Sequence, residues 1–568
     1  MSAPSPLTRP APRTTHEVRN QPPPRTEVDE YAAAPVLREG VAAFGAAWAE
    51  EHLTQVGRLV GSAGFQADAE AANVHEPVLR THDRWGHRVD EIDYHPAYHR
   101  VLGAAVGHGA HTSAWAEPRP GANVARAAVF GLFAQVEPGH ACPVSMTHAA
   151  VPSLAHAPAL ADLWRPRLLS RGYDGRLAAP ADKPGALVGM AMTEKQGGSD
   201  VRANTTVAVR ADAAGGDGEV GTYLLTGHKW FCSAPMSDAF LVLAKVADAA
   251  APTCFLVPRV LEDGARNVFR VQRLKDKLGN RSNASSEVEL DGTVGHLVGE
   301  VDRGVRTIIE MVGRTRLDCV HGSAAGMRQG VAEALWHAEH RAAFGARLVD
   351  QPAMTAVLAD LALESEAATL TSLRLAAAYD AGDAVEAEQE RAFARLATAV
   401  GKYWVCKRGP HHAAEAMECL GGNGYTETFP LARRYREQPV MAIWEGSGNV
   451  IALDVLRAIA REPASLEAFR AELATTAGAH PVLDAHTART DRLVRDAVAD
   501  PGGAQGQARR LVEAMALGLQ ASLLVRHAPS GTAEAFVAAR LGEERAHGYG
   551  ALPRGTDLTA VLARHRAP

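Results

Sequence analysis

The spacing of apolar residues changes twice along this chain, and the change limits the possible folds more than any other feature. Residues 31–180 are rich in alanine, with apolar residues three and four positions apart, which is typical of amphipathic helices. Residues 185–299 contain short β-type runs separated by turn residues, and helical spacing returns at 305–459. We therefore expect a β unit that lies between two helical units.

The β-type runs predict an antiparallel sheet or barrel. No long helical stretch separates them, whereas parallel strands need crossover connections that usually contain a helix. A large cofactor bound by this unit would therefore be held outside a parallel nucleotide-binding fold. The predicted strands are 205–209, 223–226, 239–246, 254–257 and 287–290.

The predicted fold class is α+β, with several subdomains. A chain of 568 residues is longer than one hydrophobic core usually organises. We expect a flexible arm rich in Pro and Arg, an N-terminal helical domain, an antiparallel β domain, a four-helix bundle and a helical extension. Their predicted ranges are 1–30, 31–184, 185–300, 301–462 and 463–568.

Two short segments at the start of the β unit are candidates for binding a large anionic cofactor. The Gly-Gly-Ser sequence at 197–199 lets backbone N–H groups approach a pyrophosphate closely, because glycine has no Cβ. The segment 227–233, which we expect to be a loop, supplies an aromatic pair and a hydroxyl. An ordinary polar hairpin on the surface would show the same residues, since Gly-Gly-Ser-Asp is a common turn.

The motifs Met-Thr-Glu at 192–194, Gly-Ser-Asp at 198–200 and Trp-Phe-x-Ser at 230–233 resemble the flavin-binding middle domain of the acyl-CoA dehydrogenase superfamily. The longer run at 273–284, Arg-Leu-Lys-Asp-Lys-Leu-Gly-Asn-Arg-Ser-Asn-Ala, resembles its alkylation-response AidB branch. The resemblance covers about residues 15–461 and implies FAD as cofactor. It implies a substrate-side role for Thr193, Ser199 and Ser233. The implied cofactor contacts here are Met190, Met192, Thr193, Gly198, Ser199, Trp230, Phe231, Cys232 and Ser233.

Two patterns in the second helical unit extend the resemblance. Arg341, Phe344 and Gln351 match the superfamily residues that reach the flavin nucleotide of a neighbouring subunit, which implies a homo-oligomer, with a tetramer built from dimers as the superfamily form. An exposed arginine followed by a helix C-cap glycine would look the same locally. Gly421 and Gly422 match a glycine-rich turn near the adenosine. Glu418 stands where the superfamily commonly has glutamine, although the AidB branch shares the glutamate.

Glu445 lies in a segment that resembles the superfamily loop carrying the catalytic base. There, a carboxylate removes the α-proton of an acyl thioester while the β-hydrogen leaves as hydride to flavin N5. Alternatively, Glu445 is a capping or surface residue beside a Gly-Ser-Gly turn. Some superfamily members carry the base near the equivalent of Thr315, where Asp318 is a weaker candidate. Further cofactor contacts implied in this segment are Ile443, Trp444, Ser447 and Asn449.

Composition excludes several classes of protein. A net charge of −6 gives no global attraction to nucleic acid or anionic membranes. The six cysteines lack a Cys-x-x-Cys pair, which favours reduced, mostly buried thiols over a disulfide framework or a zinc site. No apolar run approaches the roughly 20 residues of a membrane span. The first 30 residues lack the apolar core of a secretory signal, so we expect a cytoplasmic protein.

Two short segments of the first helical unit have alternative interpretations. His95 and His99 are four residues apart and could bind a metal, but Pro96 disfavours helical geometry at His95, so a role at a helix entry competes. The resemblance implies no metal. Residues 142–147 are predicted to form a turn that bears hydroxyl groups. In the superfamily this neighbourhood walls the substrate cavity, and the alternative is a buried turn between helices.

The last hundred residues are predicted to form a separate helical unit. In the AidB branch such an extension is associated with binding of double-stranded DNA and the adaptive response to alkylation. From residue 465 onward the chain has twelve arginines, no lysine and eleven acidic residues, so a basic patch would have to be local. Two functions stay open: an FAD-dependent acyl-CoA dehydrogenase, and a flavoprotein that binds DNA with little dehydrogenase activity. The candidate DNA contacts are Arg457, Arg489, Arg492, Arg495, Arg509 and Arg510.

Overall fold

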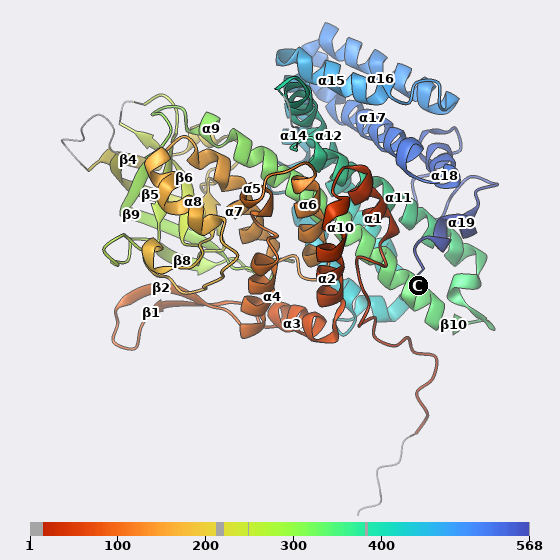
Figure 1. Ribbon diagram of the computed structural model, residues 1–568, viewed down its shortest axis with the longest axis horizontal. Helices are drawn as coiled ribbons and strands as arrows, with labels where there is room; N and C mark the ends of the chain where they lie inside the picture. Colours follow the sequence, from red (N-terminus) through yellow and green to blue (C-terminus); the bar gives the residue numbers. More distant parts are fainter. Residues whose placement is uncertain (1–14, 212–220, 248, 381–383, 567–568) are drawn as a thin grey trace, which may run out of the picture.

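The computed structural model describes residues 15–211, 221–247, 249–380 and 384–566. The β unit lies at one end of the molecule, the N-terminal helices and the long bundle helices follow, and the C-terminal helices lie at the other end (Figure 1). This is the predicted α+β architecture. Among the described residues, no helix has both the length and the apolar character needed to span a membrane.

The N-terminal unit is helical, as predicted, and packs around a core that includes Val56, Val101 and Phe133. It also contains an antiparallel hairpin, β1–β2, that was not predicted. The sequence of β1 is mostly polar, and its residues alternate between exposed and partly buried, so none of them is fully buried. The elements are α1 (Pro35–Ala43), α2 (Glu50–Gly61), α3 (Ala63–Val74), β1 (Val78–His82), β2 (Arg88–Asp93), α4 (Pro96–Gly107), α5 (Ser113–Ala116), α6 (Ala122–Ala134), α7 (Ala141–Leu154) and α8 (Pro158–Leu168).

The structure decides between the alternatives for two segments of this unit. His95 caps α4, because its Nδ1 accepts a hydrogen bond from the backbone N–H of Ala97 at 3.3 Å, which confirms the helix-entry interpretation. His99 instead contacts the hydroxyl of Tyr173 at 2.7 Å. No cluster of three or more His, Cys, Asp or Glu suited to a metal occurs in the described part of the chain. Residues 142–147 lie inside α7, so the prediction of a turn there is wrong.

The β unit is a seven-stranded sheet in the order β3-β6-β4-β5-β9-β7, with β8 paired to β9. Because β7 also pairs with β6, the strands close into a barrel. Most pairs are antiparallel as predicted, but β3 and β4 both run parallel to β6. The parallel strands β4 and β6 need no crossover helix between them, because the antiparallel strand β5 lies between them in the chain. The strands are β3 (Val188–Ala191), β4 (Val207–Arg210), β5 (Thr222–Ser233), β6 (Ala239–Val246), β7 (Thr253–Pro258), β8 (Arg270–Leu274) and β9 (Ser285–Val298).

Three long helices and a shorter pair form the bundle. Helices α10, α11 and α12 pack side by side, and both shorter helices pack on α12. A short hairpin, with two residues in each strand, follows α10 and projects from the bundle. The elements are α9 (Gly304–Thr307), α10 (Ile309–His340), β10 (Ala342–Ala343), β11 (Ala346–Arg347), α11 (Pro352–Ala377), α12 (Ala384–Glu418), the 3₁₀ helix η5 (Gly421–Tyr425), α13 (Pro430–Met441) and α14 (Gly448–Arg461).

The C-terminal extension is helical, as predicted, but it is not a separate unit. One apolar cluster runs from Leu361 and Leu396 of the bundle to Phe469, Leu519 and Leu523 of the extension. The long helix α17 packs on α11, α12 and α14, so it buries its apolar face against the bundle. The helices are α15 (Pro463–Ala474), α16 (Pro481–Ala499), α17 (Pro501–His527), α18 (Ser530–Leu541) and α19 (Leu558–Ala563).

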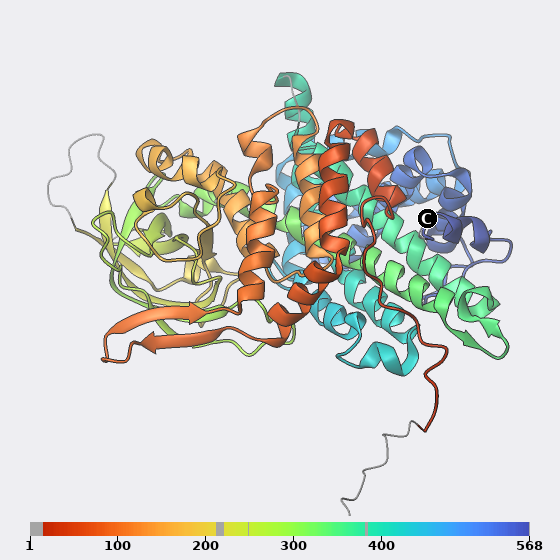
Figure 2. The same ribbon diagram turned by 60° about the horizontal axis from the view of Figure 1, so that its bottom comes forward.

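The N-terminal arm is anchored before the predicted boundary at residue 30. Arg25 and Glu30 are buried and form an ion pair, and Glu30 also binds Arg328 of α10. The prediction of a flexible segment is therefore wrong for residues 25–30, while its part at 1–14 lies outside the described residues. Figure 2 shows the arm leaving the N-terminal helices and running along the bundle helices.

Candidate active site

Glu445 lies in the tight connection between α13 and α14, and three side chains hold this connection. Thr315 Oγ1 donates to Glu445 Oε2 at 2.8 Å, and Arg316 Nε donates to the Glu445 carbonyl oxygen at 3.0 Å. Lys402 Nζ donates to the carbonyl oxygen of Gly446 at 2.6 Å. Glu445 has a φ of 60°, a left-handed conformation that non-glycine residues adopt at a cost. Helices α10 and α12 thus hold the carboxylate in a defined position.

The surroundings of Glu445 raise the pKa of its carboxyl group. Burial is the largest cause, because it disfavours the charged form. The hydrogen bond from Thr315 and the positive charges of Arg316 and Lys402 act in the opposite direction. A carboxylate with a raised pKa, held in a defined position, has the properties of a general base. Asp318, the weaker alternative, is buried in an ion pair with Arg126 of α6.

Trp444 forms a wall between the barrel and the bundle. It packs against the cluster of Cys142, Met146 and Ala234, on which Met190 of β3 also packs. It also packs against a cluster of the bundle that contains two buried cysteines. Its indole nitrogen is buried and has no hydrogen-bond partner among the described residues. Through Trp444, the segment 443–449 packs against the cluster that contains Ala234, the residue after β5, and that Met190 of β3 also contacts. The two predicted cofactor motifs of the barrel and the segment with Glu445 therefore converge.

A buried ion pair joins the two predicted cofactor motifs of the barrel. Glu194 follows Thr193 directly, and its Oε1 lies 2.8 Å from Lys229 Nζ on β5. Glu194 also accepts hydrogen bonds of 2.6 Å from Thr205 N and Thr206 Oγ1. Burial alone would raise its pKa, but Lys229 and these donors lower the pKa below its ordinary value. The pair holds the Met-Thr-Glu segment against β5, where Trp230 N also donates to Thr193 O at 2.8 Å.

The Trp-Phe-x-Ser motif is the end of strand β5 and not the predicted loop. A register shift between Lys229 and Cys232 turns the side chain of Cys232 into the barrel core. That side chain therefore cannot be one of the predicted cofactor contacts. Phe231 is half exposed, and Ser233 lies 3.1 Å from Ser285 through their hydroxyl oxygens.

The run at 273–284 contributes residues to which sequence reasoning gave no individual role. Lys275 Nζ lies 3.2 Å from the centre of the Trp230 ring, a cation–π contact. Both polar side-chain atoms of Asn283 are buried without a hydrogen-bond partner in the described part of the chain. Asn280 N donates to Glu437 Oε2 at 2.8 Å, which ties the run to α13. The resemblance of the run to the AidB branch was the signal that could have found them.

Comparisons with known proteins identify the family. Residues 20–175 match the family described as adaptive response protein AidB N-terminal domain, residues 189–293 match the acyl-CoA dehydrogenase middle domain, and residues 302–460 match its C-terminal domain. AidB of Escherichia coli is 48% identical over 451 residues, which covers 79% of this chain and 81% of that protein. The chain belongs to the AidB branch of the acyl-CoA dehydrogenase family.

Solved structures agree with this assignment of the fold. The structure of Caenorhabditis elegans ACDH-11 in complex with C11-CoA superposes with a TM-score of 0.84 at 26% identity and covers 93% of each chain. An acyl-CoA dehydrogenase from Bacillus anthracis complexed with FAD has a TM-score of 0.64 at 17% identity and covers 83% of this chain and 86% of that one. Membership of the family makes this AidB-branch protein an FAD-dependent oxidoreductase that acts on CH–CH bonds.

The residues present fit a large cofactor. The segment from Lys195 to Asp200 is exposed, and Gly198 passes so close to Thr193 that an added Cβ would lie 2.6 Å from its hydroxyl oxygen. The indole N–H of Trp444 and the side-chain amide of Asn283 are buried and have no partner among the described residues, so both can hydrogen-bond a ligand. Unsatisfied buried polar groups are costly, so a ligand that pairs with them gains affinity.

The remaining predicted cofactor residues lie elsewhere in the AidB-branch chain. Arg341, Phe344 and Gln351 belong to the β10–β11 hairpin and its flanks, at the end of the bundle far from the barrel (Figure 1). Phe344 is fully exposed, and nothing lies within 4 Å of a Cβ added at Gly421 or Gly422. Within one chain, the hairpin residues and the glycine turn therefore do not lie beside the barrel motifs.

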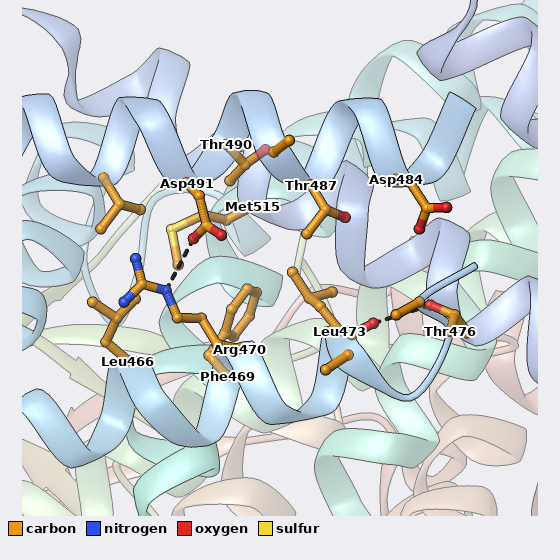
Figure 3. A pocket seen from close by; sticks show the side chains of 14 residues that line it. Leu466, Phe469, Arg470, Leu473, Thr476, Asp484, Thr487, Thr490, Asp491 and Met515 are labelled. Carbon is orange, nitrogen blue, oxygen red and sulfur yellow. Dashed lines mark hydrogen bonds and ion pairs between the residues drawn. The ribbon is translucent and has the colours of Figure 1, made fainter. Parts of the chain in front are cut away.

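The candidate DNA contacts occupy three helices that pack against one another, α14, α16 and α17. Arg457 pairs with Asp454 at 3.2 Å, and Arg509 Nε donates at 2.8 Å to Oδ1 of Asn449, in the first turn of α14. A cavity of about 380 Å³ also lies in the extension, between α15 and α16, with Arg470 and Asp491 paired at 2.9 Å beside it (Figure 3). None of its lining residues belongs to the site around Glu445.

Proposed function

We propose that this AidB-branch protein oxidises an acyl-CoA thioester with Glu445 as the base. The observation that supports this most is the position of Glu445, half buried beside Trp444, where the barrel motifs and the bundle meet. Thr315 holds Oε2, so we assign Oε1 to the proton of the substrate. The raised pKa brings the carboxyl group closer to working pH, where a base is most effective.

The reaction removes one proton and one hydride from neighbouring carbons of the acyl chain. Glu445 takes the proton from the carbon next to the thioester carbonyl, and the C–H electrons form the new C=C bond. The neighbouring carbon loses its hydrogen with two electrons, and the thioester leaves as an α,β-unsaturated product. FAD, when bound, supplies the two-electron acceptor. The partial burial of Glu445 beside Trp444 limits the access of water to the base.

We assign the cofactor to a site made by two copies of the chain. The first copy contributes Met192, Thr193, Gly198, Ser199, Trp230, Ser233 and the loop 443–449. The second contributes Arg341, Phe344 and Gln351 with the glycine turn. The distance between these groups within one chain, and the full exposure of Phe344, support this division. A homotetramer built from two such dimers is the assembly that we expect.

The first test is the Glu445→Gln variant, which keeps the size of the side chain and removes its basicity. We expect kcat/KM for acyl-CoA oxidation to fall by at least about 10²-fold, with FAD content unchanged, because the amide cannot accept the proton. Flavin bleaching under anaerobic conditions, with thioesters from short chains to C11-CoA, measures the effect.

A matched control is Glu467→Gln on the exposed surface of α15. It should leave turnover unchanged. Turnover that survives in Glu445→Gln would remove this residue as the base, and loss of FAD from that variant would show a structural role.

A second proposal is that the extension binds double-stranded DNA. One observation favours it: Arg489, Arg492 and Arg495 are all exposed and lie three residues apart on α16, so they share one face. The dehydrogenase proposal does not depend on this one.

A further inference from the structure

Asn20 of the N-terminal arm binds the edge of the β10–β11 hairpin. Its Nδ2 donates to the carbonyl oxygen of Ala342 at 2.8 Å, and Ala342 N donates to its Oδ1 at 2.7 Å. Asn20 has a φ of 56°, in the left-handed region that asparagine tolerates better than most residues. One side chain thus pairs with both backbone groups of the first hairpin residue, as a neighbouring strand would.

The same stretch of the arm contacts the other predicted cofactor elements of the bundle. The carbonyl oxygen of Asn20 accepts a hydrogen bond from Arg341 Nη1 at 2.8 Å. Gln21 Oε1 accepts one from Asn423 Nδ2 of the glycine turn at 3.4 Å. Trp336 Nε1, near the end of α10, donates to Pro23 O at 2.8 Å. Residues 20–23 therefore join the hairpin, the turn and α10.

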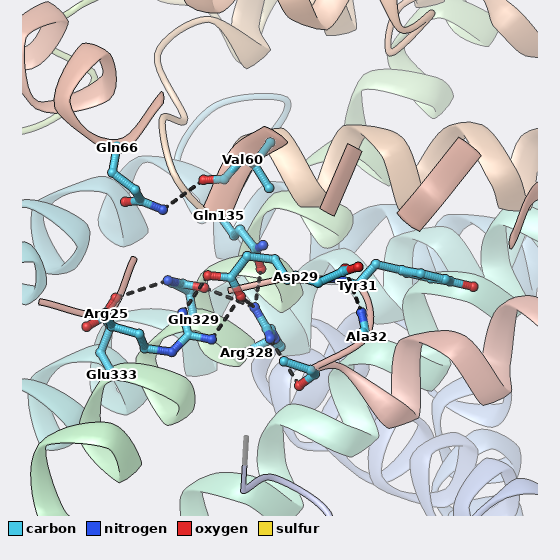
Figure 4. A network of polar contacts seen from close by, with 12 residues as sticks. Arg25, Asp29, Tyr31, Ala32, Val60, Gln66, Gln135, Arg328, Gln329 and Glu333 are labelled. Atoms are coloured by element: carbon cyan, nitrogen blue, oxygen red, sulfur yellow. Dashed lines mark hydrogen bonds and ion pairs between the residues drawn. The ribbon is translucent and has the colours of Figure 1, made fainter. Parts of the chain in front are cut away.

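A buried network anchors the arm immediately after this stretch (Figure 4). Arg25 Nη2 donates to Glu30 Oε2 at 3.0 Å, and Glu30 also pairs with Arg328 of α10. Arg328 Nη1 donates to Gln135 Oε1 at 3.0 Å. Breaking a buried, charged network of this kind is strongly unfavourable. The anchor therefore gives residues 20–23 a defined position over the hairpin.

The face that the arm organises exposes apolar surface. Phe344 is 100% exposed and Tyr425 is 83% exposed, although both lie in segments that the arm contacts through hydrogen bonds. Space is open around Cβ atoms added at Gly345, Gly421 and Gly422. Large exposed apolar residues on an ordered face indicate a binding surface. The occupant that we assign to this face is a second copy of this chain, because the proposed shared site needs these residues beside the exposed segment from Lys195 to Asp200 of a partner barrel.

We propose that residues 20–25 of the arm position the hairpin and the glycine turn for the cofactor that a second copy binds. The inference rests on the proposed function, in which Arg341 and the glycine turn complete the partner's site. Asn20 is a positioning residue in this scheme: it orients Arg341 and Ala342 and does not itself contact the cofactor.

The first experiment compares Asn20→Ala with the neighbouring Arg19→Ala. The only contact of Arg19 in the described residues is an exposed ion pair with Glu17, so its removal is a matched control. We expect Asn20→Ala to weaken FAD binding about 5- to 10-fold, as expected for the loss of two hydrogen bonds that orient the site. Sedimentation velocity and thermal unfolding of the apoprotein should stay unchanged. A lower melting temperature with unchanged FAD affinity would indicate a purely structural role and overturn the proposal.

The second experiment tests the action across subunits with mixed oligomers. One chain carries Ser199→Trp, which blocks the barrel site, and a differently tagged chain carries either Arg341→Ala or a deletion of residues 2–24 that spares Arg25. Each homo-oligomer should hold little FAD. A mixed dimer keeps one intact site, so tandem-purified mixtures should recover up to about half of the wild-type flavin content.

The outcomes separate the two proposals. If the Arg341→Ala mixture fails to recover flavin, the site is not shared between copies, and the proposed division of the site fails together with the inference. If that mixture recovers flavin and the arm-deletion mixture does not, the shared site stands and the role of the arm is overturned. Recovery in both mixtures, together with a low flavin content in each homo-oligomer, supports both. A full flavin content in the arm-deletion homo-oligomer would overturn the role of the arm.

Discussion

At the residue scale, the position of Glu445 depends on residues far away in the sequence. The loop motif was enough to nominate this carboxylate. The motif gave no indication that Thr315, 130 residues earlier, donates a hydrogen bond to it, because only the packing of α10 against the loop creates that contact. The left-handed φ of Glu445 was equally hidden, since the flanking Gly446 made a turn plausible without assigning its geometry. Sequence thus identifies the group, and tertiary packing determines its pKa.

The Thr315→Val variant tests this dependence. The Thr315 hydrogen bond favours the ionised form of Glu445 and so lowers a pKa that burial raises. Its loss should raise that pKa further, and a base must be ionised to act. We expect the acid limb of the kcat/KM profile to move to higher pH by up to about 1 unit. Thr315→Ser should restore the wild-type profile. An unmoved acid limb in Thr315→Val would exclude the hydrogen bond as a determinant of the pKa.

At the element scale, two predictions differ from the structure: the orientation of Cys232 in the barrel and the separateness of the extension. Both depend on tertiary packing, which a local sequence pattern does not show. The register shift in β5 changes which side chains face the core, so the resemblance of the motif at 230–233 did not show that Cys232 points into the barrel. The apolar spacing of residues 508–525 correctly predicted a helix. The spacing did not reveal whether the apolar face of this helix packs within the extension or on the bundle. The structure shows that it packs on the bundle.

The variant Leu523→Ala tests the continuity of that core. Leu523 is fully buried in α17, so truncation should lower the free energy of unfolding by about 2–5 kcal/mol. Because bundle and extension share one core, calorimetry should show a single transition that shifts as a whole. Leu453→Ala, at a leucine that is 38% exposed, should have a much smaller effect. Two transitions, of which only one shifts, would show that the extension unfolds independently.

At the scale of the whole molecule, neither the arrangement of charges on the surface nor the contacts of the N-terminal arm could be predicted from the sequence. The net charge of −6 excluded a globally basic protein, but it did not show that three arginines gather on one face of α16. The resemblance predicted that a neighbouring copy supplies cofactor contacts. It gave no role to the arm, whose anchoring by Arg25 and Glu30 depends on burial that the polar, proline-rich sequence does not suggest.

The double variant Arg492→Ala/Arg495→Ala tests the DNA proposal in the intact oligomer. If both arginines bind phosphates, duplex affinity should fall and the log–log salt slope should become shallower by roughly 1.8, about 0.9 for each lost contact. FAD content should not change. Arg202→Ala, at an exposed arginine near the barrel, should leave the slope unchanged. Equal slopes for the wild type and the double variant would exclude this face as the DNA site.

The common core of bundle and extension has a consequence for protein engineering. Helix α17 buries its apolar face against α11 and α12, so the last hundred residues are not a portable module. Grafted onto another protein, they would expose leucines that need these two helices, and their removal would uncover the same area on the donor. Recombination between family members should therefore succeed when a crossover keeps the bundle and the extension from one parent.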